Sequence, residues 1–261
     1  MGPKDVDSSC IDSVCTDEGI SSDHLTTPPT DLEEDGLTPE QLEQIWSWNT
    51  PVPPTLEICM HELVEKQAKE DPGRSAVISW DGAFTYQDVS SKSDQLAAHL
   101  LSIGVKIGSI VPLCFEKSRW TVVAVLAVMK SGATFALMDP SQPEGRLRTI
   151  VEQTGASTII TSKLQEDLGC RIAPSGTRVT LSDEHFDSFD TSPSLPSVPP
   201  SANLYIQFTS GSTGKPKGVI ITHQNYSSGA IPRADIVGYR SHSRVLDFAS
   251  YAFDVCIDCM L

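Results

Sequence analysis

The sequence predicts an α/β protein whose central sheet is mostly parallel. Between residues 110 and 161, short apolar runs of strand length alternate with stretches of helical length. Strands and helices that alternate in this way form a parallel sheet that helices cover on both faces. The composition, 39% hydrophobic and 20% charged residues, is ordinary for a globular protein with a buried core.

Local signals place each element along the chain. Thr38-Pro39-Glu40-Gln41 resembles a capping box and opens the first helix, and Asp81-Gly82 is a hairpin turn. Gly104 and Gly155 end helices, because glycine readily takes the backbone conformation that closes one. The predicted elements are helices over about 38–46, 55–69, 87–103, 119–130 and 144–153, a hairpin over 76–86, and strands over 110–115, 134–139, 157–161 and 179–181.

Charge and hydropathy argue against a nucleic-acid-binding protein and against a membrane-spanning one. The net charge of −15 is concentrated near the N-terminus, where residues 1–36 are expected to form a disordered acidic tail. This acidic balance argues against nucleic acid as a partner. The longest apolar run, 121–129, is too short to span a membrane and is expected to be a buried helix. No secretory signal opens the chain, so the expected compartment is the cytoplasm.

Seven cysteines form no disulfide framework in this sequence, and we expect reduced thiols. Cys256 and Cys259 make a lone CxxC pair without the second pair of ligands that zinc requires. They are interpreted as packing residues of an apolar helix, and no metal ligand is assigned.

A loop rich in glycine, serine and threonine stands between two apolar runs, 204–208 and 219–221. Glycine lets the backbone approach a phosphate closely, hydroxyls donate hydrogen bonds to phosphate oxygens, and lysines supply positive charge. The composition therefore predicts a cradle for a nucleotide triphosphate. The residues assigned to it are Thr209, Ser210, Gly211, Ser212, Thr213, Gly214, Lys215 and Lys217.

Two familiar loops are excluded by spacing. A Walker A loop has glycine five residues before its second glycine and a hydroxyl residue after the lysine, but Thr209 and Pro216 occupy those positions. A nucleophile elbow needs glycine two residues before its serine, and Ser210 stands there before Ser212. The alternative to a phosphate-binding loop is an ordinary surface turn, because the same residue types dominate such loops.

The string over 209–218 resembles the phosphate-loop motif of adenylate-forming enzymes, which include acyl-CoA synthetases, luciferases and the adenylation domains of nonribosomal peptide synthetases. Residues 131–140 resemble the second core motif of the synthetases, and Phe84-Thr85-Tyr86 the first. The resemblance implies ATP as a ligand and the N-terminal part of the adenylate-forming fold. It places an incomplete adenylation domain at 37–261.

Residues 251–255 resemble the fourth core motif of those adenylation domains. The resemblance implies that Asp254 binds the α-ammonium of an amino acid and that Phe253 lines the same pocket. The physical reason is that an ammonium leaving water needs a carboxylate to offset its lost hydration. Asp254 could instead cap the helix that follows it, a common use of aspartate. His223 could lie near the nucleotide or close the loop, and Trp46 and Trp48 are expected to be core anchors.

The resemblance also implies that several functional residues of the family lie outside these 261 residues. In the family, the glutamate that binds Mg²⁺, the aspartate that holds the ribose and the catalytic lysine come further along the chain. We therefore assign no catalytic residue and expect the chain alone to be inactive. We also expect a loading module, with carrier and condensation domains as partners and 4′-phosphopantetheine only on the carrier. The alternatives are an acyl- or aryl-CoA ligase, for which Asp254 would not matter, and a nucleotide-binding pseudoenzyme without turnover.

Overall fold

The computed structural model describes residues 37–49, 54–186, 188–189, 194–210 and 215–261. The predicted tail at 1–36 lies outside these ranges. The strands are β1 (Ser75–Ser79), β2 (Gly82–Thr85), β3 (Ile110–Cys114), β4 (Thr134–Met138), β5 (Thr158–Ser162), β6 (Thr177–Leu181), β7 (Asn203–Ser210) and β8 (Pro216–Thr222). The helices are α1 (Pro39–Asn49), α2 (Met60–Glu70), α3 (Tyr86–Ser102), α4 (Arg119–Lys130), α5 (Glu144–Thr154), α6 (Glu166–Ile172), α7 (Asp183–Phe186), α8 (His223–Ile236) and α9 (Val255–Asp258).

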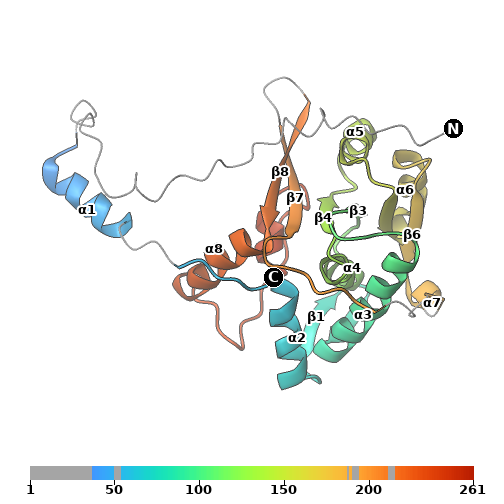
Figure 1. Cartoon of the computed structure of the whole chain (residues 1–261), viewed down its shortest axis with the longest axis horizontal. Helices are drawn as coiled ribbons and strands as arrows, with labels where there is room; N and C mark the ends of the chain where they lie inside the picture. The colour runs from blue at the N-terminus through green and yellow to red at the C-terminus, as the bar shows by residue number, and fades with distance from the viewer. Residues whose placement is uncertain (1–36, 50–53, 187, 190–193, 211–214) are drawn as a thin grey trace.

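The main sheet has six strands in the order β6-β5-β3-β4-β7-β8. All neighbouring pairs are parallel except β7 and β8, which form an antiparallel hairpin at one edge. This confirms the predicted α/β class with a mostly parallel sheet. Figure 1 shows the β7–β8 hairpin extending beyond the rest of the sheet.

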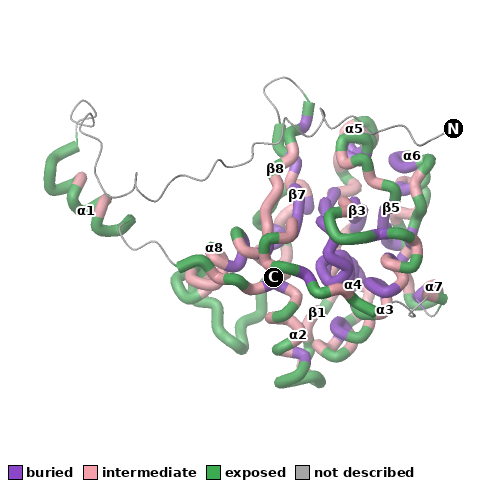
Figure 2. Tube along the Cα trace, in the orientation of Figure 1, coloured by how far each residue is buried: buried purple, intermediate pink, exposed green. Residues whose placement is uncertain are grey.

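A hydrophobic core lies on each face of the sheet. Alternate residues of β4 serve the two cores, because successive strand side chains point to opposite faces. Phe135 packs with α3 and α4, whereas Ala136 and Met138 pack with α5 and α6. Helix α4, the predicted buried helix, is the most buried of the described helices and is largely purple in Figure 2. Within the described ranges, no helix combines the length and the apolar content needed to cross a membrane.

Between β2 and β5, the predicted boundaries of the helices agree closely with those in the structure. The Asp81-Gly82 turn joins β1 to β2 with Gly82 at φ 128°, and Gly155 ends α5 at φ 59°, conformations that favour glycine. The box at Thr38 is also present, since the Gln41 amide donates to Thr38 Oγ1 at 3.3 Å.

Two predictions near the N-terminus are wrong. The second helix begins at Met60 and not at Thr55, because Leu56 is hydrogen-bonded to α8 instead. Its amide donates to Ser228 Oγ at 2.9 Å, and its carbonyl accepts from Ser227 Oγ at 2.9 Å. Trp48 is no core anchor: it is 69% exposed on α1, a helix without buried residues that Figure 1 shows beside the main body.

Candidate functional site

The β7–β8 hairpin carries the predicted phosphate loop. Its ladder is paired as far as Ser210 opposite Pro216, and residues 211–215 connect the two strands in the sequence. Thr209, Ser210, Lys215 and Lys217 lie at this end of the hairpin, and all four are exposed. Gly211, Ser212, Thr213 and Gly214 lie outside the described residues. The loop therefore follows the carboxyl end of a strand in a mostly parallel sheet, the edge at which such sheets bind ligands.

The chemistry at the hairpin end fits a phosphate group. Among the described residues, no carboxylate lies within ion-pair distance of Lys215 or Lys217, so neither positive charge is already neutralised. Thr209 Oγ1 makes only a long hydrogen bond, 3.4 Å, to the Lys217 carbonyl. Exposed ammonium groups and a weakly engaged hydroxyl are donors suited to the oxygens of a triphosphate such as that of ATP.

Gly218 on β8 leaves room for two side chains of the paired strand β7. A Cβ atom at this position would lie 2.5 Å from Ile206 Cδ1 and 3.3 Å from Phe208 Cε1. Both neighbours belong to the core beneath β7, so they have little room to move. A glycine is needed here for space, not for an unusual backbone conformation.

The segment that carries Asp254 is fastened to the carboxyl ends of two parallel strands. Lys117, which follows β3, donates to Asp247 Oδ1 at 2.6 Å and to the Ala249 carbonyl. Its ammonium also lies 3.7 Å from the centre of the Tyr251 ring, a cation–π contact. Asp139, which follows β4, accepts a hydrogen bond from Ser250 Oγ.

Strand β7 supplies the third attachment. Gln207 Nε2 donates to the Ala252 carbonyl at 2.6 Å, two residues before Asp254. Side chains two apart in a strand share a face, so Tyr205, Gln207 and Thr209 form one row along β7. At about 3.3 Å per residue, this row spans about 13 Å from Tyr205 to the base of the phosphate loop.

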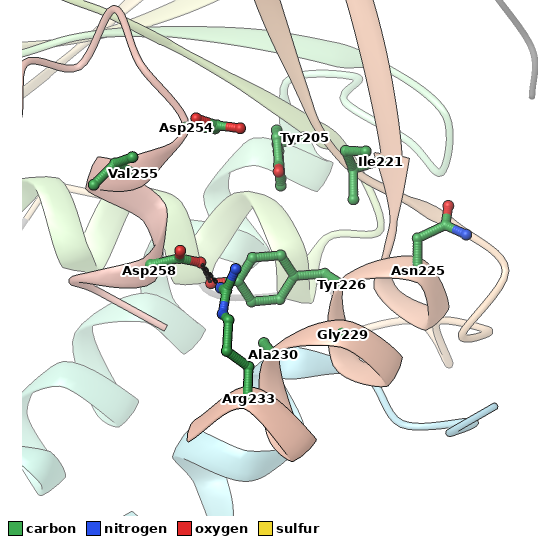
Figure 3. A pocket seen from close by; sticks show the side chains of 10 residues that line it. All are labelled: Tyr205, Ile221, Asn225, Tyr226, Gly229, Ala230, Arg233, Asp254, Val255 and Asp258. Carbon is green, nitrogen blue, oxygen red and sulfur yellow. Dashed lines mark hydrogen bonds and ion pairs between the residues drawn. The ribbon is translucent and has the colours of Figure 1, made fainter. Parts of the chain in front are cut away.

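A pocket of about 320 Å³ is lined by Tyr205, the residue at one end of this row (Figure 3). Its lining residues are Tyr205, Ile221, Asn225, Tyr226, Gly229, Ala230, Arg233, Asp254, Val255 and Asp258. Asp254 stands at the N-cap position of α9, but its side chain makes no capping hydrogen bond. The capping alternative thus has no bond to support it. Phe253 is 65% exposed and is not among the lining residues, so its assignment to the pocket stays a prediction.

The pocket also holds an ion pair that sequence reasoning missed. Arg233 on α8 contacts Asp258 Oδ1 at 2.7 Å, and Tyr226 Oη donates to the same oxygen at 2.8 Å. Burial, together with the carboxylates of Asp254 and Asp258, raises the pKa of Tyr205 to about 12. Tyr205 therefore stays protonated at neutral pH. One signal was available: Asp258 follows Asp254 by four residues, the spacing that puts two side chains on the same side of a helix.

His223 is a buried residue that caps a neighbouring helix. It is 0% exposed, and its Nδ1 accepts the amide of Met60, the first residue of α2, at 3.2 Å. Cys59, His61 and His223 offer possible metal-ligand atoms within 4.8 Å of one another. Because His223 Nδ1 accepts a hydrogen bond from the Met60 amide, the hydrogen of the neutral ring is on Nε2, and a nitrogen that carries a hydrogen does not bind a metal. We assign no metal to this cluster.

This histidine is expected to make the fold sensitive to acid. Burial, and then the neighbouring His61, lowers the pKa of His223 from 6.5 to about 4. The neutral ring thus stabilises the fold above pH 6.5, and that contribution is lost as the pH falls from 6.5 through about 4. We expect a loss on the order of 3 kcal/mol in the free energy of unfolding. Urea denaturation between pH 7 and 4 measures it.

The matched variant for this measurement is His223→Gln, because an amide oxygen can still accept the Met60 hydrogen bond and does not titrate. Carboxylates also lose stability in acid, so the informative quantity is the difference between the two pH profiles. Parallel profiles for the wild type and H223Q would contradict this assignment.

The comparisons with known proteins agree with this geometry. Residues 64–261 match the family model described as "AMP-binding enzyme". Nonribosomal peptide synthetase SIDD of Beauveria bassiana (strain ARSEF 2860) is 59% identical over 227 residues, which cover 86% of this chain and 12% of that protein. Nonribosomal peptide synthetase 1 of Ajellomyces capsulatus is 56% identical over 232 residues, covering 86% of this chain and 13% of that protein. The chain therefore spans only a small part of the length of these relatives.

A solved structure shows the same fold. The nonribosomal peptide synthetase FmoA3 (S1046A), in its α-methyl-L-serine-AMP bound form, superimposes with a TM-score of 0.73 at 22% sequence identity. The match covers 82% of this chain and 24% of that one. This supports the prediction that these residues form the N-terminal part of an adenylate-forming fold.

Proposed function

We propose that this chain, which belongs to the AMP-binding enzyme family, binds ATP and an amino acid as part of a nonribosomal peptide synthetase that adenylates the amino acid. The family follows from the match over residues 64–261, and the class of synthetase from relatives that are 59% and 56% identical. The adenylation activity is proposed here, because the chain matches only 12% and 13% of the length of those relatives.

The row of side chains on β7 is the observation that carries this proposal. It joins the Asp254 pocket, through Tyr205 and Gln207, to the base of the phosphate loop at Thr209. The two ends are about 13 Å apart, a span that suits an amino acid and a nucleotide meeting between them. One strand thus positions both candidate ligands, and reactions of this kind depend mainly on such positioning.

Each group in the site has a distinct task in this scheme. ATP, when bound, supplies the α-phosphorus that an amino acid carboxylate attacks, with release of pyrophosphate. Lys215 and Lys217 offset the charge of the phosphates, and the hydroxyls of Thr209 and Ser210 donate to their oxygens. Asp254 pairs with the α-ammonium and so orients the carboxylate. Lys117, Asp139 and Gln207 hold the backbone that presents Asp254.

Finer parts of the scheme stay predictions from the sequence. They are a loading module, Mg²⁺ held by a residue beyond position 261, carrier and condensation domains as partners, 4′-phosphopantetheine on the carrier, and no turnover by these 261 residues alone.

Replacing Gln207 by leucine tests the role of β7. The change removes the donor to the Ala252 carbonyl but keeps a side chain of similar size. We expect the KM for the amino acid to rise about tenfold, the equivalent of one lost hydrogen bond, while the KM for ATP stays within about twofold. Amino-acid-dependent exchange of labelled pyrophosphate into ATP by the native full-length protein measures both constants.

The control is Gln224→Leu, which removes only a long, exposed contact from Gln224 Nε2 to Glu57 at 3.5 Å. Equal effects of the two leucine variants, or a change in the KM for ATP alone with Q207L, would overturn the proposed link between the two sites.

A further inference from the structure

The pocket beside Asp254 contains three charged side chains, and two of them already neutralise each other (Figure 3). Arg233 and Asp258 are paired at 2.7 Å, with side chains that are 51% and 31% exposed. Among the described residues, no cation lies within ion-pair distance of Asp254. The lining therefore carries one uncompensated negative charge, and that charge is on Asp254.

Helix α8 fixes the position of Arg233. Tyr226, Ala230 and Arg233 follow one another at spacings of four and three residues, so they share the side of α8 that faces the pocket. Tyr226 holds Asp258 Oδ1 from one direction, and Arg233 holds it from another. The pair is therefore set in place by two elements, α8 and α9.

One uncompensated charge matches one ammonium group. An α-amino acid brings its α-ammonium to Asp254, and its carboxylate takes part in the reaction. A second ammonium, on the side chain, would meet a carboxylate already paired and a guanidinium that repels it. A side-chain carboxylate would add a third negative charge to the pocket. An uncharged side chain avoids both costs, and an amide or hydroxyl can bond to the remaining atoms of the pair.

We propose that Arg233 determines specificity for an amino acid with an uncharged, hydrogen-bonding side chain, because it neutralises Asp258 inside the pocket. This inference rests on the proposed function, since it concerns the amino acid that Asp254 holds. Arg233 acts here through its charge. It neutralises the carboxylate of Asp258, which would otherwise favour a substrate with a basic side chain.

A double-mutant cycle that neutralises each charge of the pair, made in the native full-length protein, tests this directly. Pyrophosphate exchange is measured with glutamine, citrulline, lysine, ornithine and glutamate for the wild type, Arg233→Met, Asp258→Asn and the double variant. The wild type is expected to favour an uncharged substrate. R233M leaves two unpaired carboxylates, so kcat/KM for lysine or ornithine relative to glutamine should rise at least about tenfold.

The remaining variants separate charge from shape. D258N leaves Arg233 unpaired, so it should shift the preference toward glutamate. The double variant restores a single negative charge in the pocket and should restore the wild-type preference, which a steric role of Arg233 would not do. Arg240→Met is the control, because Arg240 pairs with Asp235 at 3.4 Å and does not line the pocket.

The outcomes distinguish the two proposals. A wild-type preference for lysine, ornithine or glutamate, or a double variant that keeps the R233M preference, would overturn the role of Arg233 and leave adenylation standing. Failure of every amino acid to support exchange would overturn the adenylation proposal and this inference with it.

Discussion

Asparagine in place of Asp254 is expected to lower kcat/KM for the amino acid at least about 30-fold. Asparagine has nearly the same shape but no charge, so the α-ammonium would enter the pocket without a counter-ion. Asp254 is exposed in this structure, and the bound amino acid would desolvate the pair that it forms. Removing one partner of such a pair typically costs about 2–5 kcal/mol, which corresponds to a factor of about 30 to several thousand. Pyrophosphate exchange measures the effect, with the KM for ATP expected to change little.

Asp235→Asn is the matched control for this variant. Asp235 lies on α8, where its side chain is 89% exposed, and among the described residues its one ion pair is the long contact with Arg240 at 3.4 Å. We expect D235N to keep the wild-type kcat/KM within about twofold. Wild-type kinetics for D254N would instead favour the acyl- or aryl-CoA ligase alternative, whose substrates carry no amine for Asp254 to bind.

Valine in place of Gly218 is expected to destabilise the fold by about 2–3 kcal/mol. The new Cβ would lie 2.5 Å from Ile206 Cδ1, and the two further methyl groups add to the overlap with Phe208. Forcing extra atoms into a packed core costs about 1–3 kcal/mol, and this position lies at the upper end because two core residues must move. Thermal or urea denaturation measures the change in the free energy of unfolding.

The control is Gly145→Ala on α5, where an added Cβ meets no atom within 4 Å. Alanine favours a helix over glycine, so this variant should be as stable as the wild type or more stable by up to about 1 kcal/mol. If G218V and G145A unfold at the same denaturant concentration, the side chains of Ile206 and Phe208 do not fill the space beside Gly218.

Local patterns explain why much of the fold could be predicted. Strand–helix alternation over residues 110–161 led to the parallel strands β3, β4 and β5 and the helices α4 and α5 almost residue for residue. Caps and turns at Thr38 and Asp81 act within four residues, and such short-range signals survive in the structure.

Elements that depend on distant contacts could not be predicted in this way. Helix α8 has no clear apolar side and contains Pro232, so its sequence does not signal a helix of that length. The region from 54 to 59 is not helical because Leu56 bonds to α8, more than 160 residues away in the chain. Tertiary bonding overrides the local helical pattern there.

The residues of the candidate site differ in the same way, because some could be predicted from local sequence and others depend on distant contacts. Thr209 and Lys215 stand out in the sequence because the residue types of their loop suit a phosphate, and Asp254 is found through the resemblance of residues 251–255 to a family motif. Gln207 and Arg233 do not, because their roles come from partners 45 and 25 residues away that only the fold brings to them. One sequence signal does mark Gln207: it is the polar residue inside the apolar run that forms β7.

The most direct test of the account is whether exchange of pyrophosphate into ATP by the native full-length protein requires an α-amine on the substrate. A panel of amino acids is compared with the same carboxylic acids lacking the amine. The account predicts exchange with at least one amino acid and at least about 100-fold less with its deaminated analogue, because Asp254 loses the ammonium it pairs with. Equal exchange with the two compounds, or exchange with fatty or aromatic acids alone, would contradict it.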